Sequence, residues 1–505
     1  MDRTDCSAVG ADQGAGQQLV LWELGRQEVT LDFTGQQVVS DTGLLLIRQL
    51  DRKLGVLAEA AARLDDPRSQ RYVSHDAEEL LVQQVYQLLA GYFDANDANA
   101  LRHDPLFQAI ADVSPNSERP LASGSTISRF RYAYTRREQE LSPEERTIDE
   151  ECQAAKCQRL RALNQFYVEL FVKTRPQPPA RIILDIDASD DATHGHQQLS
   201  LFHGYYDQHQ YLPLFVFDGE SGFPLAAWLR SGTAHPSWGA QEVLAEIVSQ
   251  LRAAWPDVEI VVRADGGYAT PELLTFLEQQ QLKYVIGYAR NAVLERRSQL
   301  WQNYVAARSD LYDEPGCLFT EFSDYQSLGW ERPRRVIAKC EITASGGPNR
   351  RFVVTNLTGT PHDIYRGLYV KRGKYPEQGI GELKHGLQMD RLSAHRFFAN
   401  AFTLQCHVLA YALWVLFREA NAEIPEVAGH QLSTVRSQLF KVGALVTVSV
   451  RRIWFRISES WPGSKLFRQA SAAVNQFAAR WGRLWSDRLE QGLAARLGGQ
   501  VSLLK

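Results

Sequence analysis

The sequence predicts an α/β fold built around a mixed β-sheet. Two short apolar runs of buried-strand type, RIILDID (Arg181–Asp187) and VEIVVRAD (Val258–Asp265), are separated by an amphipathic helix over Gly239–Ala254. Before that helix, Tyr211–Asp218 and Phe223–Leu229 are joined by a glycine turn, which is typical of antiparallel neighbours. We therefore expect three leading strands followed by a β-α-β crossover, with helices on the faces of the sheet.

The remaining elements follow the same periodicities. The pattern is strand-like over Leu19–Val39, helical over Asp41–Ala111 and helical again over Pro143–Val172. A proline-rich break, KTRPQPPA, ends this part of the chain. After the crossover we expect a helix from Pro271, strands at KYVIGYA, RRVIAKCEI and RRFVVTNL, and helices from Pro376 almost to the end, interrupted near Ile424–Gln431 and by the strand-like Thr447–Ile457.

These elements divide the chain into six regions. We expect a disordered lead at 1–18, a mainly helical N-terminal region at 19–172, the first part of the core at 181–299, a β-rich insertion at 300–366, the second part of the core at 367–420, and a C-terminal helical region at 421–505.

The net charge of −4 hides a strong asymmetry along the chain. From Lys371 to Lys505 there are 19 Lys and Arg against 9 Asp and Glu, a net charge of 19 − 9 = +10. The preceding residues carry 36 − 50 = −14. An acidic front and a basic rear predict a polyanionic partner for the rear part.

The sequence indicates a cytoplasmic protein that does not span a membrane. The N-terminal residues are polar and lack the apolar core of a secretion signal. The most apolar stretch, Phe402–Phe417, is interrupted by Gln405 and His407 and is too short to cross a bilayer. Six scattered cysteines form no dense disulfide framework and complete no zinc site.

Three aspartates lie at the ends of the two predicted buried strands. Asp185 and Asp187 are two residues apart, so their side chains share one face, and Asp265 closes the second strand before Gly266–Gly267. Buried carboxylates are costly unless a metal or hydrogen-bond donors compensate them. The alternatives are aspartates that only cap loops, or a functional cluster; the pairing across two strands of one sheet favours the cluster.

The segment YVKRGKYPEQGIGELKHGL (Tyr369–Leu387) supplies further candidates. Pro376 suits the first turn of a helix. At about 100° per residue, Lys384 lies about 20° from Glu377, so the two side chains should point together. Glu382 lies about 140° from Glu377 and should be solvated.

A basic cluster precedes this helix. It comprises Lys371, Arg372 and Lys374 with Tyr369, and it either binds phosphate or forms an ordinary solvated face. Three carboxylates from distant segments beside phosphate-binding cations suit divalent ions that activate water for phosphoryl transfer.

Four sequence blocks now resemble a known family. They are LDIDASDDATHGHQ, FHGYYDQHQYLPLFVFDG, RADGGY and Y-V-K-R…E-Q-G-I-G-E-L-K, and they look like the signature blocks of DDE transposases of the IS1380 group, within the insertion-sequence families that share a Tyr-Arg-Glu-Lys signature. The resemblance covers roughly Leu19 to the C-terminal helices. It implies an RNase H-like catalytic core interrupted by an insertion before the glutamate.

The resemblance also assigns residues. Asp187, Asp265 and Glu377 match the catalytic, metal-binding carboxylates, with Asp185 as the alternative first ligand. Tyr369, Arg372 and Lys384 match the other signature positions, although four residues separate Arg372 from Glu377 where the usual pattern has three. The implied cofactor is two Mg²⁺ or Mn²⁺ ions.

The implied activity is cut-and-paste transposition in a bacterial, nucleoid-associated setting. The DNA partners would be the terminal inverted repeats and the target DNA, with a homodimer on the paired ends, the N-terminal region binding DNA and the C-terminal region serving dimerisation or DNA contact. The alternatives are a catalytically silent DNA-binding protein derived from a transposase, or a metal-dependent nuclease without strand transfer.

Other candidates carry less weight. His194, His196, His203 and His209 fit no familiar zinc spacing. Arg230 and His235 either lie near the active site or serve a loop; Trp238, Trp301 and Trp330 either stack on a flipped base or belong to the core; Arg451, Arg452 and Arg456 either touch DNA or are simply solvated.

Overall fold

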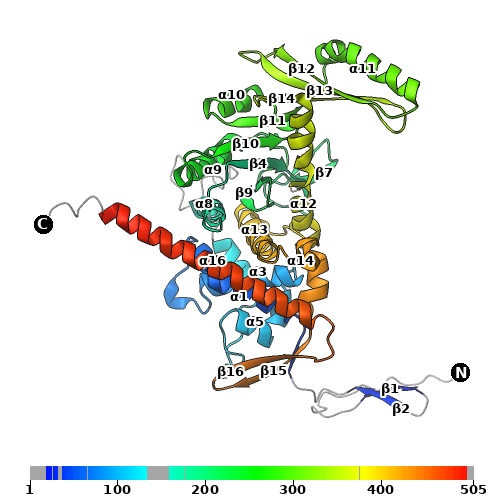
Figure 1. Cartoon of the computed structure of the whole chain (residues 1–505). Coiled ribbons are helices and arrows are strands. Elements are labelled where there is room, and N and C mark those ends of the chain that lie inside the picture. The colour runs from blue at the N-terminus through cyan, green and yellow to red at the C-terminus, as the bar shows by residue number, and fades with distance from the viewer. Residues whose placement is uncertain are drawn as a thin grey trace.

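The computed structural model describes residues 19–24, 27–31, 37–64, 66, 68–133, 158–175, 177–374 and 376–497 (Figure 1). The predicted disordered lead at 1–18 and the first half of the helix predicted over Pro143–Val172 lie outside these residues.

The central sheet confirms the predicted mixed α/β fold class with an RNase H-like strand plan. Strands β4 (Arg181–Ala188), β8 (Leu214–Asp218) and β9 (Pro224–Trp228) are antiparallel neighbours. Helix α9 (Ala240–Ala254) then crosses to β10 (Glu259–Ala264), which runs parallel to β4. Helix α10 (Pro271–Gln279) leads to β11 (Lys283–Tyr288), parallel to β10. Three leading strands and β-α-β crossovers are therefore present as predicted.

The β-rich segment after β11 extends this same sheet. Helix α11 (Ala292–Tyr312) precedes the antiparallel strands β12 (Cys317–Tyr325), β13 (Arg334–Ile342) and β14 (Pro348–Thr355). Strand β14 pairs with β11, so the eight strands are ordered β12-β13-β14-β11-β10-β4-β8-β9. Figure 1 shows α11 against the outer strands, at the far end of the molecule from the N-terminal helices.

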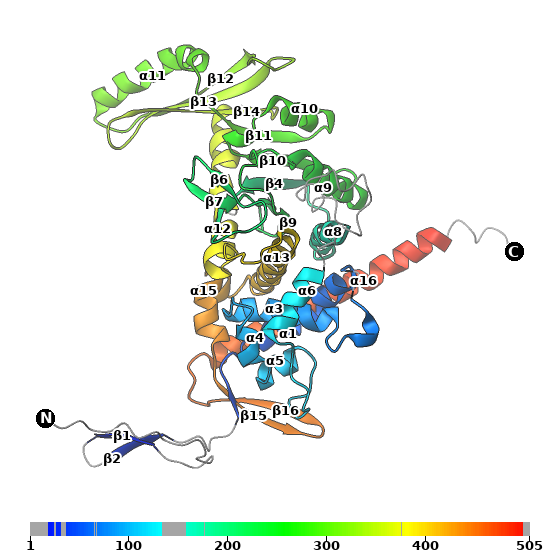
Figure 2. The ribbon, with the colours of Figure 1, turned by 180° about the vertical axis from the view of Figure 1, so that it is seen from behind.

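One long, irregular helix runs along the side of the sheet. It consists of a π-helical stretch (Asp363–Tyr369), a 3₁₀ stretch (Val370–Lys374), α12 (Pro376–Gly381) and a second π-helical stretch (Glu382–Gly386). Such π turns are rare and frequently mark functional sites. Beside α12 lies a small sheet of β5 (Asp191–Ala192), β6 (Leu201–His203) and β7 (Gln208–Tyr211), as Figure 2 shows.

The N-terminal region is mainly helical, and two of its helices begin at an aspartate whose side chain caps the helix. Asp76 accepts a hydrogen bond from the Glu79 amide, and Asp104 accepts from the amides of Leu106 and Phe107. The elements are β1 (Leu19–Leu24), β2 (Gln27–Leu31), β3 (Val38–Val39), α1 (Leu44–Leu54), α2 (Val56–Ala62), α3 (Ala77–Ala90), α4 (Asp97–Leu101), α5 (Pro105–Ile110), α6 (Gly124–Ala133) and α8 (Gln158–Lys173), with a 3₁₀ turn at Gln70–Tyr72.

Helix α13 (Phe397–Ala420) is the central helix of the core. It packs against α3 and α6 of the N-terminal region and against strand β9 (Figures 1 and 2). Helix α13 has 24 residues and is therefore longer than the apolar stretch Phe402–Phe417. The prediction that this segment is too short to cross a bilayer is wrong. Among the described residues it is the one helix that is long and apolar enough to cross a membrane. Its apolar segment is entirely buried by the rest of the protein. Burial, rather than length, explains its composition.

The C-terminal region contains a β-hairpin as well as helices. Strands β15 (Ala444–Ser449) and β16 (Arg452–Ile457) form the strand-like interruption that was predicted, and β15 also pairs with β3 from the start of the chain. The predicted interruption near Ile424–Gln431 instead includes one short helix, α14 (Pro425–Ala428), that starts at a proline. The other elements are α15 (Leu432–Val435), a π turn at Arg436–Phe440 and α16 (Ser464–Leu497).

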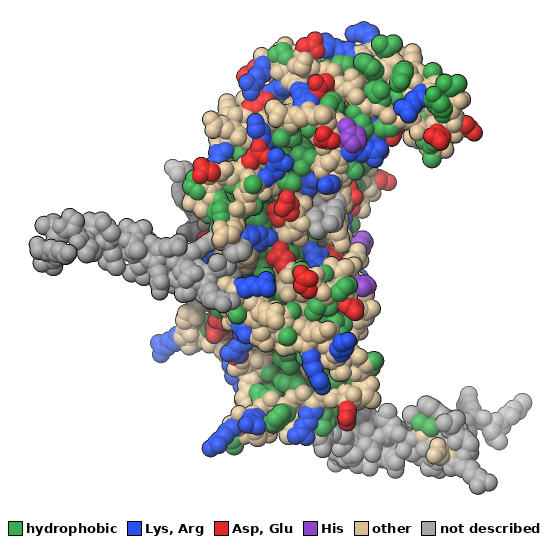
Figure 3. Space-filling model, viewed as in Figure 1, with side chains coloured by type: hydrophobic (Ala, Val, Ile, Leu, Met, Phe, Trp, Pro, Cys, Tyr) green, Lys and Arg blue, Asp and Glu red, His purple; other side chains and the backbone are tan. Residues whose placement is uncertain are grey.

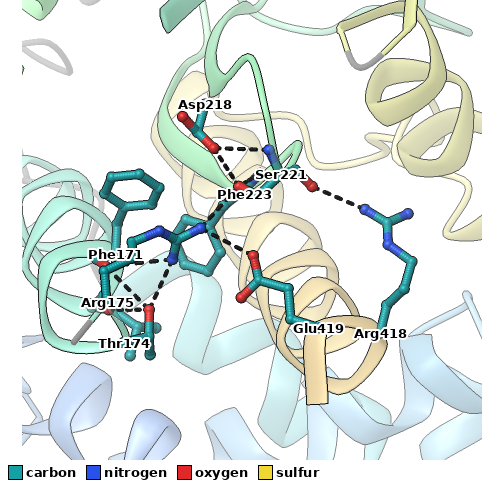
Figure 4. A network of polar contacts seen from close by, with 9 residues as sticks. Phe171, Thr174, Arg175, Asp218, Ser221, Phe223, Arg418 and Glu419 are labelled. Atoms are coloured by element: carbon teal, nitrogen blue, oxygen red, sulfur yellow. Dashed lines mark hydrogen bonds and ion pairs between the residues drawn. The ribbon is translucent and has the colours of Figure 1, made fainter. Parts of the chain in front are cut away.

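A partly buried polar network fixes α8 and α13 to the β8–β9 turn (Figure 4). The Arg175 guanidinium donates to Ser221 Oγ and Glu419 Oε1, both at 3.0 Å, and stacks 3.7 Å from the Phe171 ring centroid. Asp218 accepts from the amide and hydroxyl of Ser221 at 2.8 and 2.5 Å. Because charged groups here are paired rather than orphaned, the network defines how the helical body meets the sheet.

Candidate active site

Asp187 and Asp265 meet at one edge of the sheet. Strands β4 and β10 are parallel, with Asp185 opposite Arg263; two more residues along this register place Asp265 beside Asp187. Asp187 Oδ1 accepts from the Ala188 amide at 3.0 Å. Asp265 caps the turn Gly266–Tyr268 and accepts from the Gly267 amide at 2.9 Å. The carboxyl ends of parallel strands thus bring two carboxylates together.

Asp185 has a different environment from Asp187. Its two oxygens accept from Nε and Nη2 of Arg263, each at 2.5 Å, and both side chains are essentially inaccessible to solvent. Arg263 Nη1 donates to the Leu368 carbonyl at 2.8 Å. This bidentate pair therefore joins two strands to the residue that precedes Tyr369.

Arg372 lies among the proposed metal ligands. Its Nη1 is 3.0 Å from Asp187 Oδ2, and both side chains are largely buried. Burial opposes the charged guanidinium, but the nearby Asp187, Tyr369, Asp265 and Glu377 raise the pKa of Arg372. Burial raises the pKa of Asp187 to about 6; Arg372 opposes this rise, whereas Asp265 and Glu377 add to it. The three carboxylates and the guanidinium are therefore one electrostatic cluster.

Glu377 reaches this cluster from the first turn of α12. It is exposed, and its carboxylate turns back toward Gly373, where an added Cβ would lie 3.5 Å from Oε2. The carboxylate lies near the helix N-terminus, where the helix dipole favours negative charge.

Tyr369 lies at the same site, close to the turn that follows Asp265. A Cβ added to Gly287 of β11 would lie 2.7 Å from the Tyr369 hydroxyl and 2.8 Å from the Gly266 amide nitrogen. Gly287 is thus needed for the close approach of the tyrosine to the turn that Asp265 caps.

The predicted lysines differ in their placement. Lys384 pairs with Asp190, at 2.7 Å, and does not pair with Glu377 as the ideal helical geometry suggested. Asp190 also accepts from Gln208 of β7 at 3.2 Å. Lys371 is exposed, and the side chain of Lys374 lies outside the described residues.

A comparison with protein families decides the class of the protein. A family model described as "Transposase DDE domain group 1" matches residues 22–479. The chain belongs to this family. A DDE transposase domain is that of a DNA nuclease and strand transferase, so the protein is a transposase.

Other comparisons concern curated proteins and solved structures. No curated protein matches the chain. Among solved structures, a piggyBac transposase synaptic complex with hairpin DNA, seen by cryo-electron microscopy, matches with 11% identity and a TM-score of 0.43, covering 80% of each chain.

One prediction about the transposase was wrong. Glu382, expected to be solvated, is only 3% exposed. It accepts hydrogen bonds from the Leu432 amide at 3.0 Å and from Trp414 Nε1 at 3.2 Å, and it pairs with Arg418 at 3.4 Å. The expectation assumed a regular, one-sided α-helix, whereas Glu382 begins a π turn and faces donors from α13 and α15.

Sequence reasoning missed two neighbours of the carboxylates. The tip of the β6–β7 hairpin carries Tyr205, 85% exposed, and Tyr206, 40% exposed, with ring centroids 5.0 Å apart. Burial raises the pKa of Tyr206, as do Asp190, Tyr205, Asp187 and Asp265, so this tip lies beside the site. The signal was present in FHGYYDQH, where paired aromatics occupy a turn between polar residues.

The remaining candidates of the transposase are placed as follows. Buried Arg230 donates to the carbonyls of Leu212, Pro236 and Trp238, so it organises the loop that packs on Gly267. His235 bonds Ser237. Trp330 is buried against Tyr288 and Tyr325, whereas Trp238 and Trp301 are partly exposed.

Among the described residues, no three His, Cys, Asp or Glu side chains are close enough together to hold a metal ion as they stand. This is true both of the histidines at 194, 196, 203 and 209 and of Asp187, Asp265 and Glu377.

Proposed function

We propose that the protein is the transposase of an insertion sequence of the IS1380 group. It would cut the terminal inverted repeats of its own element and join the 3′-hydroxyl ends to target DNA. The observation that supports this proposal is the electrostatic interaction of Asp187, Asp265 and Glu377 with one another and with Arg372, within a chain that belongs to a DDE transposase family.

The donor chemistry of the site fits two divalent cations. Carboxylate oxygens are the ligands that Mg²⁺ and Mn²⁺ prefer. Burial is the main cause of the raised pKa of Asp187, and repulsion from Asp265 and Glu377 adds to it; a divalent cation would relieve this repulsion. When bound, such ions would activate water and stabilise the charge of an in-line phosphoryl displacement. We assign their binding to Asp187, Asp265 and Glu377, since both oxygens of Asp185 are already bonded to Arg263.

The remaining residues of the site would hold the DNA. Arg372, 3.0 Å from Asp187, would pair with the scissile phosphate, and the Tyr369 hydroxyl would orient this phosphate by a hydrogen bond. Lys384, the exposed Lys371 and Lys374 would neutralise neighbouring phosphates.

The basic rear of the chain offers a second DNA contact. Arg451, Arg452 and Arg456 are exposed on the β15–β16 hairpin, and the guanidinium groups of Arg452 and Arg456 lie 5.5 and 5.9 Å from the Trp454 ring centroid. Exposed arginines beside an exposed aromatic suit a phosphate backbone. We further propose a homodimer on paired DNA ends, acting on the nucleoid in the bacterial cytoplasm.

The test is a cleavage and joining assay with purified protein and the inverted repeats that flank its reading frame. Asp265→Ala should abolish Mg²⁺-dependent nicking. Asp257→Ala, at an exposed aspartate in the turn before β10, is the matched control and should cleave like the wild type.

Other outcomes would contradict parts of the proposal. If the wild type binds the ends but never breaks a strand, the protein is a silent DNA-binding derivative. If strands break without joined target products, it is a nuclease only. If Asp265→Ala cleaves at the wild-type rate, the site assignment is wrong. If no inverted repeats of the IS1380 type flank the reading frame, the assignment to that group fails.

A further inference from the structure

Helix α11 presents two different faces. Its inner face, with Leu294, Ser298, Gln302 and Val305, is buried against β12–β14. Its outer face exposes Val293 by 40%, Leu300 by 72%, Tyr304 by 56% and Leu311 by 74%. Figure 3 shows hydrophobic side chains gathered in the part of the surface where α11 lies. Large apolar groups gathered in this way mark an interaction surface.

The outer face follows a heptad pattern. Val293, Arg297, Leu300, Tyr304, Ala307 and Leu311 are spaced by four, three, four, three and four residues. Val293, Leu300, Tyr304 and Leu311 fall within about 40° of one another around the helix. This is the a and d spacing of a coiled-coil seam, and we call these six residues the α11 seam.

The one charged residue of the α11 seam is directed away from it. Arg297 pairs with Asp324 of β12 at 2.8 Å, and its guanidinium lies 6.0 Å from the Phe322 ring centroid and 5.9 Å from that of Tyr325. The seam therefore presents apolar groups to a partner, while its charge is held by the neighbouring strand.

We propose that the α11 seam binds the α11 seam of a second copy of this chain, antiparallel and across a two-fold axis. In this register Val293 faces Leu311 of the other copy, Leu300 faces Tyr304, and Arg297 faces the small Ala307. Each of these contacts occurs twice, as an isologous interface requires.

Flanking charges support this register. The positions preceding the seam residues on one side are Arg296, Asn303 and Asp310. When Asn303 faces itself across the axis, Arg296 of each copy faces Asp310 of the other. A parallel pairing would instead keep Arg296 two heptads away from Asp310 of the other copy, so that these charges could not pair. The charge pattern thus selects the antiparallel arrangement.

DNA is a poorer occupant of this face. From Ala292 to Glu314 the chain carries three arginines, Arg296, Arg297 and Arg308, against Glu295, Asp310, Asp313 and Glu314, a net charge of 3 − 4 = −1. A helix that binds a polyanion would carry an excess of positive charge. The proposal deepens the homodimer of the proposed function, since it names the contact that pairs two protomers, but its test needs no DNA cleavage.

The experiment is sedimentation equilibrium of the full-length protein without DNA, over a wide range of concentrations. We expect a reversible dimer. Leu300→Glu should raise its dissociation constant at least about tenfold, because a carboxylate would be buried opposite Tyr304. Leu328→Glu, at a fully exposed leucine outside the seam, is the matched control and should leave the constant unchanged. Circular dichroism checks that both variants are folded.

A charge exchange tests the register itself. Arg296→Asp alone and Asp310→Arg alone should each weaken the dimer, because two like-charged pairs then face each other. The double variant should restore it, and mixing the two single variants should give heterodimers. A wild type that stays monomeric at all concentrations, or a dimer that Leu300→Glu leaves intact, would overturn the proposal. A chain that dimerises through α11 but cuts no DNA would support this interface and contradict the proposed function alone.

Discussion

Replacing Asp185 or Asp187 with asparagine should separate a structural carboxylate from a catalytic one. The two residues are neighbours on one face of β4, and the family resemblance alone left either as the first metal ligand. Asp185 is bonded through both oxygens to buried Arg263, whereas Asp187 is partly accessible and belongs to the electrostatic cluster with Asp265 and Glu377. We expect Asp185→Asn to lower stability and Asp187→Asn to abolish cleavage.

The magnitude follows from the burial of the Asp185–Arg263 pair. Asp185→Asn leaves a guanidinium that is 1% exposed without its counter-charge. Removing one partner of a buried ion pair costs roughly 3–5 kcal/mol. Asp187→Asn removes a carboxylate whose charged form is already disfavoured, since its pKa is raised to about 6. Its free energy of unfolding should stay within about 1 kcal/mol of the wild type.

The assay is urea unfolding followed by tryptophan fluorescence, beside Mg²⁺-dependent cleavage of the inverted repeats at low urea. The double variant Asp185→Asn, Arg263→Gln should recover part of the lost stability, because no unpaired charge is left. The Leu368 carbonyl would still lose its guanidinium donor, so full recovery is not expected. The reasoning is refuted if Asp185→Asn is as stable as the wild type, or if folded Asp185→Asn fails to cleave while Asp187→Asn cleaves.

Three further predictions concern other parts of the protein. Gly287→Ala should lower cleavage at least about a hundredfold and stability by roughly 1–3 kcal/mol, because its Cβ would displace Tyr369 and the turn after Asp265; Gly347→Ala, on the β13–β14 turn and with only an ordinary 3.6 Å contact to Thr343, is the control in the same cleavage and unfolding assays. Burial lowers the pKa of His407 to about 3 from its ordinary 6.5, so the unfolded chain takes up the proton first and stability falls as the pH drops below 6.5. Between pH 7.5 and 5.5 the free energy of unfolding of the wild type should therefore fall by about 1.4 kcal/mol more than that of His407→Leu, as measured by urea unfolding. Equal losses in the two proteins would contradict this. Replacing both Arg452 and Arg456 with alanine should reduce the slope of log binding constant against log salt by about 1.8 in a DNA-binding titration, and an unchanged slope would remove the β15–β16 hairpin from the DNA interface.

The strands and their acidic ends could be predicted because their signals are local. Apolar runs such as RIILDID and VEIVVRAD identify buried parallel strands, and parallel strands bring their carboxyl ends to one edge. The approach of Asp265 to Asp187 follows from these two facts alone.

The partners of individual charges could not be predicted, because they come from distant segments. The guanidinium of Arg263, about eighty residues further along the chain, donates hydrogen bonds to Asp185. Glu382 accepts hydrogen bonds from Trp414 and from the Leu432 amide. The predicted directions of Glu382 and Lys384 also assumed a regular α-helix with about 100° per residue. The 3₁₀ and π turns on the two sides of α12 change the angle between successive side chains. Likewise, a region boundary at residue 300 divided α11 in the middle and concealed its heptad pattern.

The position of Arg372 has a consequence for how the protein is made. Three carboxylates brought together at a sheet edge would repel one another and oppose folding, but the guanidinium 3.0 Å from Asp187 offsets part of that repulsion from within the chain. The polypeptide therefore needs no inorganic counter-ion to complete its fold, in contrast to small zinc domains that unfold without their metal. A chelator should stop the chemistry and leave the protein folded, with a melting temperature lowered only by the loss of ion binding. The protein can then fold before it is able to cut DNA, and the cutting activity depends separately on the concentration of magnesium.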